Sequence, residues 1–447
     1  MNAIGAAFLA IASVLMLALP RRLAVLPLVL SALYMTGAQL LQIGPATFTI
    51  PRLLVLVGFM RVLVRGEGIT SGLQTVDKLI LLWAAVLIGT SAFHTSDAWL
   101  YRSGIVWTEL GCYFLFRIFM QDLDDVCATF RLTCIVMLPL AALMLLEKAT
   151  GHNPFSVLGA AISNSVVREG HVRAAGPFSH PILAGTVGAA CLAMAFAIRP
   201  TARWASRAGL VAGAGIVAAA TSSGPILMVV FIILGIATWV LRYHMRALRW
   251  SIVAGILALA AVMKDPVYFL MARVDISGGS QGYYRSQLIR SSIQHLSEWW
   301  MAGTDYTRHW MQSGISANDR HADITNHFLA MGVMGGLPLM LVFVGMLAYS
   351  FRDVGRALNQ LADAPRQDQL FVWALGALLF GFCMDFWSIS LFDQSVTFFY
   401  LSLAAIQGVA SQDQTQFDVG EPWERPQDMG MAPRASTVNC KAAAENP

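Results

Sequence analysis

Thirteen long apolar stretches recur along the chain, and they limit its possible folds more than any other feature. A helix needs about 20 mostly apolar residues, with some leeway, to cross the roughly 30 Å hydrocarbon core of a bilayer. Charged residues make up only 13% of the sequence, whereas soluble domains carry about a quarter. We therefore expect an all-α polytopic membrane protein, with about 12–13 transmembrane helices in residues 1–410. The stretches are 3–19, 23–42, 48–64, 77–94, 103–120, 126–146, 180–198, 206–222, 225–243, 249–266, 326–349, 369–386 and 395–410.

Two of these stretches leave the number of spans open. Only Ser223 and Gly224 separate 206–222 from 225–243, so the pair is either a tight hairpin or one broken element. At the N-terminus, Arg21 and Arg22 follow the first apolar run, whereas a secretory signal carries its positive charge in front. We expect a retained first helix with its N-terminus outside.

Lysines and arginines concentrate in alternate turns, and this predicts the orientation of the chain, because such residues favour the cytoplasmic side. The orientation places two long loops in the periplasm, about 147–179 and 267–325, and a disordered tail, 411–447, in the cytoplasm. The acidic turn Gln121–Asp125 is an exception that Arg117 relieves only in part. The expected location is the cell inner membrane. The cytoplasmic residues are Arg21, Arg22, Arg65, Lys78, Arg199, Arg203, Arg207, Arg242, Arg246, Arg249, Arg352, Arg356 and Arg366.

Several classes of site have no support in the sequence. The six cysteines form no CxxC pair, and none lies in the two long loops, so they read as buried apolar residues rather than disulfide or metal positions. The sequence contains no basic cluster with interleaved aromatic residues, so it gives no indication of a nucleic-acid partner. No internal repeat is visible, which disfavours the transporters built from inverted repeats.

Arginines gather in the two outer loops. The guanidinium group is permanently charged and binds phosphate through a rigid fork of donors, so such a cluster suits a pyrophosphate carried on a lipid. The alternative for any one of them is a solvated loop charge. The residues are Arg168, Arg173, Arg273, Arg285, Arg290, Arg308 and Arg320.

The second loop also contains an apolar set at helical spacing. This pattern predicts a helix lying along the membrane interface, either as a lid over a site or as a simple anchor. The set is Tyr283, Tyr284, Leu288, Ile289, Ile293, Leu296, Trp299 and Trp300.

His321 precedes a long apolar stretch and is the candidate general base. In a helix, positions 321, 325, 328, 332 and 335 would share one face, so His321 would lie at the mouth of a close helix contact made by glycines. An imidazole takes a proton near neutral pH, and Asp323 or Asp305 could orient it. The alternative is a histidine that hydrogen-bonds a helix start. His327 lies off that face and is a weaker candidate.

Charged residues inside membrane spans are expensive and often functional. Four positions qualify: Arg52, Arg61, Glu109 and Asp385. Arg61 could simply extend towards the cytoplasmic side, and Glu109 and Asp385 could either pair with site arginines or be structural.

Three local patterns resemble the superfamily of O-antigen ligases and Wzy-type polysaccharide polymerases. The first is Arg173-Ala-Ala-Gly-Pro-Phe-Ser-His-Pro181 before a span, and the second is Arg285 in an amphipathic stretch leading to Gly303-Thr-Asp305. The third is His321 followed by Gly332 and Gly335. Ala322 replaces the Asn, Ser or Gln that usually follows the histidine in ligases, so the chain looks more like the exopolysaccharide polymerases of the group.

The resemblance implies a metal-independent membrane glycosyltransferase without a cofactor, acting on undecaprenyl-pyrophosphate-linked oligosaccharides at the periplasmic face. It would join a growing glycan to a hydroxyl of an incoming lipid-linked repeat unit. His321 would deprotonate that hydroxyl, and Arg173 and Arg285 would hold the pyrophosphate. A chain-length regulator and a flippase would be fitting partners, besides the lipid bilayer. Further substrate-binding candidates are Arg168, Arg290, Asp305, Arg308, Arg320 and His327.

Two other functions remain open from the sequence. A ligase would transfer the glycan to lipid A-core, and the identity of the acceptor alone would distinguish it. A non-enzymatic flippase or transporter of lipid-linked sugars would place its charged residues along a cavity at mid-membrane. The charges here gather in the outer loops, which favours chemistry at the membrane face.

Overall fold

The computed structural model describes residues 1–159, 166–168, 170–273, 282–311 and 320–411. This part of the chain contains fifteen α-helices and two short strand pairs, so the predicted all-α fold is confirmed. The helices are α1 Ala3–Ala18, α2 Leu26–Tyr34, α3 Ile50–Arg65, α4 Thr75–Thr90, α5 Ser96–Phe119, α6 Leu123–Thr150, α7 Pro181–Ala197, α8 Arg203–Ala220, α9 Ser223–Ala237, α10 Met245–Val262, α11 Gly282–Gln294, α12 Leu296–Trp299, α13 His327–Gln360, α14 Arg366–Asp385 and α15 Val396–Ala410. The strands are β1 Leu40–Ile43 paired with β2 Ala46–Thr49, and β3 Val166–Arg168 paired with β4 His171–Arg173.

The chain is a polytopic membrane protein. Five helical segments are long and apolar enough to cross a bilayer, and α1 and α7 are shorter apolar helices. The five segments are Thr75–Phe93, Leu123–Thr150, Ser223–Val262, His327–Gln360 and Arg366–Asp385.

Each of the thirteen predicted stretches coincides with an α-helix, but α2 falls short of its stretch. It covers nine residues, and the β1–β2 hairpin occupies the end of the stretch that was expected to continue as helix. At about 1.5 Å per residue, α2 is far too short to cross the hydrocarbon core by itself. The ambiguous pair 206–222 and 225–243 is a tight hairpin: α8 ends at Ala220, and α9 begins at Ser223.

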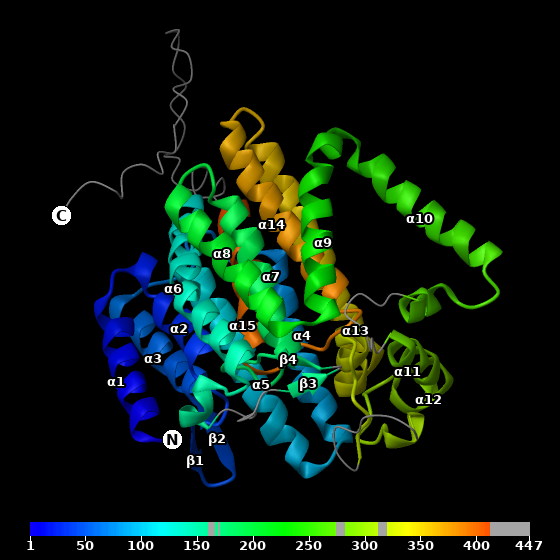
Figure 1. The fold of residues 1–447 in the computed structure, drawn as a ribbon, viewed down its shortest axis with the longest axis horizontal. Coiled ribbons are helices and arrows are strands. Elements are labelled where there is room, and N and C mark those ends of the chain that lie inside the picture. The colour runs from blue at the N-terminus through cyan, green and yellow to red at the C-terminus, as the bar shows by residue number, and fades with distance from the viewer. Residues whose placement is uncertain (160–165, 169, 274–281, 312–319, 412–447) are drawn as a thin grey trace, which may run out of the picture.

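Small residues bring the helices of the bundle close together. A Cβ atom on Gly213 of α8 would lie 2.7 Å from the carbonyl oxygen of Gly188 in α7, so these two backbones touch. Such contacts are the usual means of helix packing in membranes, where burial of apolar surface gives little drive for association. In contrast, α10 leans away from the bundle, and none of its residues is buried (Figure 1).

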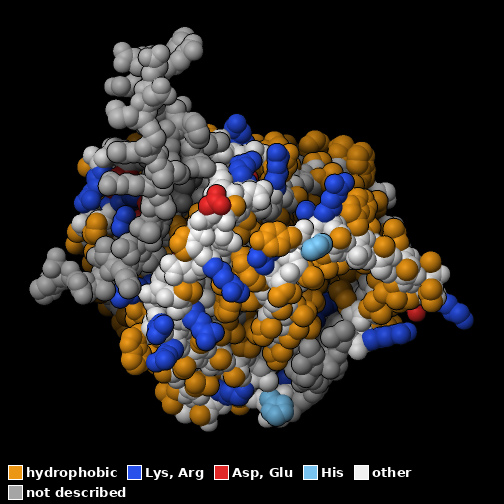
Figure 2. All heavy atoms as spheres, turned by 90° about the horizontal axis from the view of Figure 1, so that it is seen from above, with side chains coloured by type: hydrophobic (Ala, Val, Ile, Leu, Met, Phe, Trp, Pro, Cys, Tyr) orange, Lys and Arg blue, Asp and Glu red, His pale blue; other side chains and the backbone are white. Residues whose placement is uncertain are grey.

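The molecule has two chemically different ends, which we name the outer and the inner end. At the outer end, Asn2 donates a hydrogen bond to the carbonyl oxygen of Val157 over 2.8 Å, so the N-terminus lies beside the first long loop. The opposite, inner end carries the Lys and Arg side chains of the short turns, and few acidic groups are in view there (Figure 2). Which of the two ends faces the periplasm stays a prediction.

The acidic turn Gln121–Asp125, an exception to the preference of positive residues for this end, is compensated by arginines from another turn. Both Arg21 and Arg22 reach the Asp125 carboxylate over 2.8 Å, so inner-end arginines from a distant turn compensate its charge. The relief comes from this pair rather than from Arg117.

The helix predicted to include His321 begins later, and this prediction was wrong. Residues 321–326 are not helical, Asn326 caps the helix through its side chain, and α13 starts at His327. The helix then breaks at Gly335 and Gly336, where Gly336 has a φ of +75°.

The predicted close contact at the glycines of α13 does exist. A Cβ on Gly332 would lie 2.5 Å from the ring of Trp299, and one on Gly336 would lie 2.5 Å from the backbone of Met301. The amide of Leu337, freed by the break, donates to the carbonyl oxygen of Trp300 over 2.7 Å. The second loop therefore packs directly against α13 at the glycines of this helix.

The apolar set of the second loop forms helices as predicted, but in two pieces, α11 and α12. Leu288 and Trp299 are buried in a small separate core with Trp310, whereas Tyr283 and Trp300 are exposed. The second loop thus has an apolar interior of its own.

The cysteine prediction is confirmed for the described residues. Cys112, Cys127, Cys134 and Cys191 are buried and Cys383 is partly buried, all as free thiols. Cys440 and almost all of the tail predicted to be disordered lie outside the described residues.

Candidate functional site

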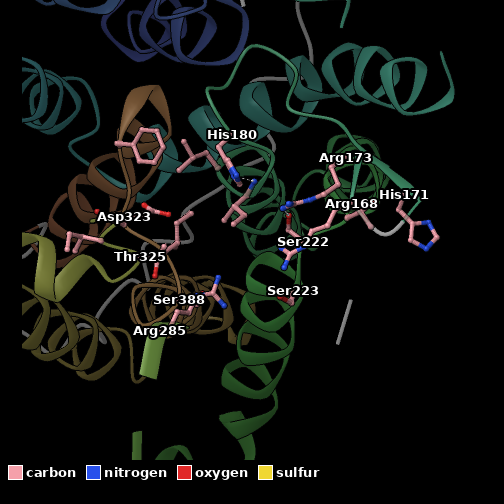
Figure 3. Close-up of a pocket in the computed structure, with 17 residues that line it drawn as sticks. Arg168, His171, Arg173, His180, Ser222, Ser223, Arg285, Asp323, Thr325 and Ser388 are labelled. Carbon is pink, nitrogen blue, oxygen red and sulfur yellow. Dashed lines mark hydrogen bonds between the residues drawn. The ribbon is translucent and has the colours of Figure 1, made fainter. Parts of the chain in front are cut away.

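A cavity of about 450 Å³ opens at the outer end, and we take it as the candidate site. Four parts of the chain that are distant in sequence form its wall: the β3–β4 hairpin with the start of α7, the α8–α9 turn, the second loop and the segment after α14 (Figure 3). The lining residues are Arg168, His171, Arg173, His180, Ile182, Leu183, Thr221, Ser222, Ser223, Arg285, Asp323, Ile324, Thr325, Ser388, Ile389, Ser390 and Phe392.

The β3–β4 hairpin brings Arg168 and Arg173 to one face. Arg168 pairs with His171 and Val166 pairs with Arg173, and alternate residues of a strand share a face, so both arginines belong to the same side of the hairpin. Arg173 is 6% exposed, and its guanidinium group donates to the hydroxyl of Ser222 in the α8–α9 turn (Figure 3).

The segment that follows Arg173 is held from several directions. The buried carboxylate of Glu147 accepts the backbone amides of Ala175 over 3.0 Å and Gly176 over 2.8 Å. Asp393 accepts both the amide and the hydroxyl of Ser179. Charge-assisted bonds of this kind are stronger than neutral ones, so the arginine is presented on a rigid support.

Arg285 enters the cavity from the second loop. It lies on α11, one turn before Leu288, whose burial in the separate core fixes the direction of this helix. Tyr284 donates its hydroxyl to the carbonyl oxygen of Asp323 over 3.0 Å, which ties α11 to the non-helical segment before α13. As a result, Arg285 is 9% exposed and lines the cavity together with Asp323.

Within the described part of the chain, the cavity arginines form no ion pair with a carboxylate. None of the ion pairs among the described residues involves Arg168, Arg173 or Arg285. The Nε atoms of Arg173 and Arg285 are also buried without a hydrogen-bond partner in the described structure. Burial lowers the pKa of both guanidinium groups, and nearby Arg168 lowers both further. At Arg285, the carboxylates of Asp385 and Asp323 act in the opposite direction. A buried cation without a partner is costly, and an anion bound in the cavity would remove that cost.

His180 lines the cavity as a hydrogen-bond donor. Its Nδ1 accepts the backbone amide of Ile182 over 3.1 Å at the start of α7, so the neutral ring carries its proton on Nε2. Burial, with Arg173 and Arg168 nearby, lowers the pKa of His180 to about 4. The ring therefore stays neutral at pH 7 and offers an N–H group rather than a basic nitrogen.

Asp323 is the carboxylate among the lining residues. Burial raises its pKa, and Arg285 offsets that rise in part. Thr325 and Ser388 add hydroxyl groups to the wall beside it. The described lining residues thus combine three fixed positive charges, one carboxylate and several neutral donors, a set suited to an anion that carries hydroxyl groups.

His321 is not part of the cavity wall, although Asp323 two residues later is. Its side chain is partly buried, and its pKa is lowered by burial and by Arg320, while Asp305 acts in the opposite direction. Asp305 itself is engaged elsewhere, because it accepts His94 over 2.5 Å and the amide of Thr95 over 2.9 Å. The role of His321 as base remains a prediction.

The structure does not bring the remaining predicted residues into the cavity wall. Arg290 and Arg320 are exposed. Arg308 donates to the carbonyl oxygen of Met311 over 3.4 Å. His327 is 6% exposed against Phe386, and its Nδ1 accepts the amide of Leu391 over 3.2 Å.

Among the charged residues of the predicted spans, Asp385 lies next to the cavity, whereas Glu109 and Arg52 have partners elsewhere. Asp385 lies at the end of α14 beneath the cavity, where it accepts the hydroxyls of Thr186 over 2.6 Å and of the lining residue Ser388 over 3.3 Å. Glu109 accepts the Tyr400 hydroxyl, and Arg52 donates to the carbonyl oxygen of Thr47.

Arg61 is paired and fully buried instead of extending towards water. It donates to both carboxylate oxygens of Glu67, over 2.9 and 2.7 Å. It also donates to the carbonyl oxygens of Met16 and Leu19. This cation therefore links α1 to α3 and is structural.

Sequence reasoning missed the α8–α9 turn and His180. His180 stands inside the Arg173–Pro181 pattern, directly before a helix-starting proline, so its place as a helix cap was visible. Thr221 has a left-handed φ of +44°, which is strained for a β-branched residue and marks a constrained turn. No sequence signal indicated that this turn would face Arg173.

Comparison with known proteins adds no family to this geometry. Neither a protein-family model nor a curated protein sequence matches the chain.

Proposed function

We propose that this protein polymerises lipid-linked oligosaccharide repeat units into an exopolysaccharide at the periplasmic face of the inner membrane. The observation that carries the proposal is the pair Arg173 and Arg285, both buried and both lining one cavity without a carboxylate partner in the described structure. A pyrophosphate that joins an undecaprenyl chain to a glycan would supply the missing negative charge. The motif resemblance supplies the reaction class.

In the proposed reaction, a hydroxyl oxygen of the incoming repeat unit attacks the anomeric carbon at the reducing end of the growing glycan. The bond from that carbon to the pyrophosphate oxygen breaks, and the lipid pyrophosphate leaves with the electron pair. Arg173 and Arg285 stabilise the charge that grows on the leaving group, which is the electrostatic contribution expected to be largest. The Nε2–H group of His180 adds a neutral donor to the same cavity.

The proton of the attacking hydroxyl must pass to a base. His321 is the residue that the resemblance indicates, and Asp323 is the carboxylate on the cavity wall. Because His321 is not among the lining residues, the acceptor would have to extend beyond the arginine-lined wall to reach it. General-base catalysis typically contributes about 10²–10⁴-fold, so its removal is measurable.

The deciding experiment compares His321→Ala, Asp323→Asn and wild-type protein in cells, with lipid-linked precursors and surface polysaccharide analysed together. Accumulation of single lipid-linked repeats in His321→Ala supports polymerisation with His321 as base. The same accumulation only in Asp323→Asn would move the base to Asp323. Long glycan retained on its lipid would identify a ligase instead, and repeats trapped on the cytoplasmic leaflet would identify a flippase.

A further inference from the structure

Three potential metal ligands meet on the second loop, away from the residues that line the cavity. One ligand atom from each of His295, Glu298 and His309 lies within 4.8 Å of the other two. His295 and Glu298 are three residues apart at the junction of α11 and α12, and His309 comes from the short 3-10 helix Arg308–Trp310. Residues three apart on a helical turn face the same way, which suits joint coordination.

The hydrogen bonds around the cluster leave the imidazole of His295 ready to coordinate. Its Nδ1 lies 2.9 Å from the carbonyl oxygen of Ser291, and a carbonyl can only accept, so Nδ1 carries the proton. The lone pair of Nε2 is therefore available. Metal-binding histidines typically show this arrangement, with the second ring nitrogen donating to a backbone carbonyl.

Hydrogen bonds and a ring contact also hold the carboxylate and the second histidine, although Nδ1 of His309 is buried without a hydrogen-bond partner in the described structure. Trp310 donates its indole N–H to Glu298 over 3.0 Å, and Nε2 of His309 lies 2.9 Å from the same carboxylate. The rings of Tyr306 and His309 are stacked with centroids 4.9 Å apart, which restrains the second imidazole. A divalent cation would take the place of the proton shared between His309 and Glu298.

We propose that His295, Glu298 and His309 form a binding site for a divalent transition metal ion of the Zn²⁺ type. Two imidazole nitrogens and one carboxylate oxygen form a ligand set that zinc accepts in tetrahedral sites, with water in the fourth position. The ion would join the end of α11, which carries Arg285, to the segment Arg308–Trp310. Its role would be to brace the second loop, independently of the proposed polymerase reaction.

The test uses the full-length protein purified in detergent, stripped with EDTA and then exposed to Zn²⁺ or, as a control ion, Mg²⁺. We expect about one zinc per chain by elemental analysis. We also expect Zn²⁺ but not Mg²⁺ to raise Tm, by roughly 3–5 °C at a zinc concentration near 100 times Kd. His295→Gln and Glu298→Gln should lose both effects. His152→Gln, at an exposed histidine outside the cluster, should keep both.

A second measurement needs no variant and so does not depend on the folding of one. Co²⁺ added to the stripped wild-type protein should give the visible absorption of tetrahedral cobalt with nitrogen and oxygen ligands. The proposal is overturned if that absorption is absent and zinc leaves Tm unchanged. Equal zinc binding by wild type and His295→Gln would also overturn it. In either case the cluster would be only an ion pair between His309 and Glu298.

Discussion

Arginines at the two ends of the molecule are used in opposite ways. At the inner end, Arg61 binds both oxygens of Glu67, and Arg21 and Arg22 both bind Asp125. At the outer end, Arg173 and Arg285 are buried like Arg61, yet neither they nor Arg168 take part in an ion pair of the described residues.

We expect paired arginines to contribute to the stability of the fold, and unpaired buried arginines to contribute to ligand binding. A cation whose partner belongs to the same chain is satisfied when the protein folds, so its removal should mainly weaken the fold. A buried cation without such a partner lowers the stability of the empty protein and is satisfied when a ligand anion arrives. Arg173 and Arg61 are the pair of residues on which this distinction can be tested.

The largest effect should follow from Arg173→Ala. Loss of one donor to the developing charge should reduce the rate of polymer formation from lipid-linked repeats by about 10²–10³-fold. The melting temperature should stay the same or rise, because an uncompensated buried charge is removed. A loss of rate accompanied by a clear fall in Tm would contradict the comparison, since it would give Arg173 a structural role.

Arg61→Ala should show the reverse behaviour. The change leaves Glu67 without its partner and frees the carbonyl oxygens of Met16 and Leu19, at an expected cost of about 3–5 kcal/mol in the free energy of unfolding. We expect a lower Tm in detergent and less folded protein in the membrane. The activity per folded molecule should change little.

Arg285→Lys tests whether the shape of the guanidinium group matters beyond its charge. Lysine keeps the positive charge but loses the fork that can bind two phosphate oxygens at once. We expect roughly a tenfold loss of rate, since about 1.4 kcal/mol of transition-state stabilisation corresponds to that factor. A rate equal to that of wild type would show that only charge is required at this position.

The pH dependence should report the base. If His321 accepts the proton, the rate falls as the pH drops through the pKa of this imidazole, and burial places that pKa below the ordinary value for histidine. Arg320→Gln removes a charge that lowers this pKa, so the falling limb should move to higher pH. His180 should add no inflection between pH 5 and 8, because its pKa lies near 4.

The smallest effect is expected for Arg290→Ala. Arg290 shares α11 with Arg285 but is exposed and outside the cavity wall, so surface substitution should leave both rate and Tm nearly unchanged. It is therefore the matched control for Arg285. A loss comparable to that of Arg285→Lys would restore Arg290 as a substrate-binding residue.

Much of the candidate site could be expected from local patterns, and the limits of those patterns are physical. The family resemblance singled out Arg173 and Arg285 among the loop arginines, and both line the cavity. The helical spacing at His321 wrongly predicted that this residue lies in the helix, because spacing does not show that Asn326 caps the helix. In sequence, Arg308 and Arg290 cannot be told apart from the other loop arginines. Only the packing of the loop decides which of these arginines line the cavity.

The sequence by itself determined the all-α membrane architecture, the positions of its apolar helices and the charge difference between the two ends. These follow from local properties: the length of apolar stretches and the residues of the turns between them. Only the tertiary structure decided that Ser222, His180, Asp323 and Arg173 share one cavity. That outcome depends on contacts between segments up to 150 residues apart, which no short-range periodicity encodes, because each contact needs the helices between to pack first.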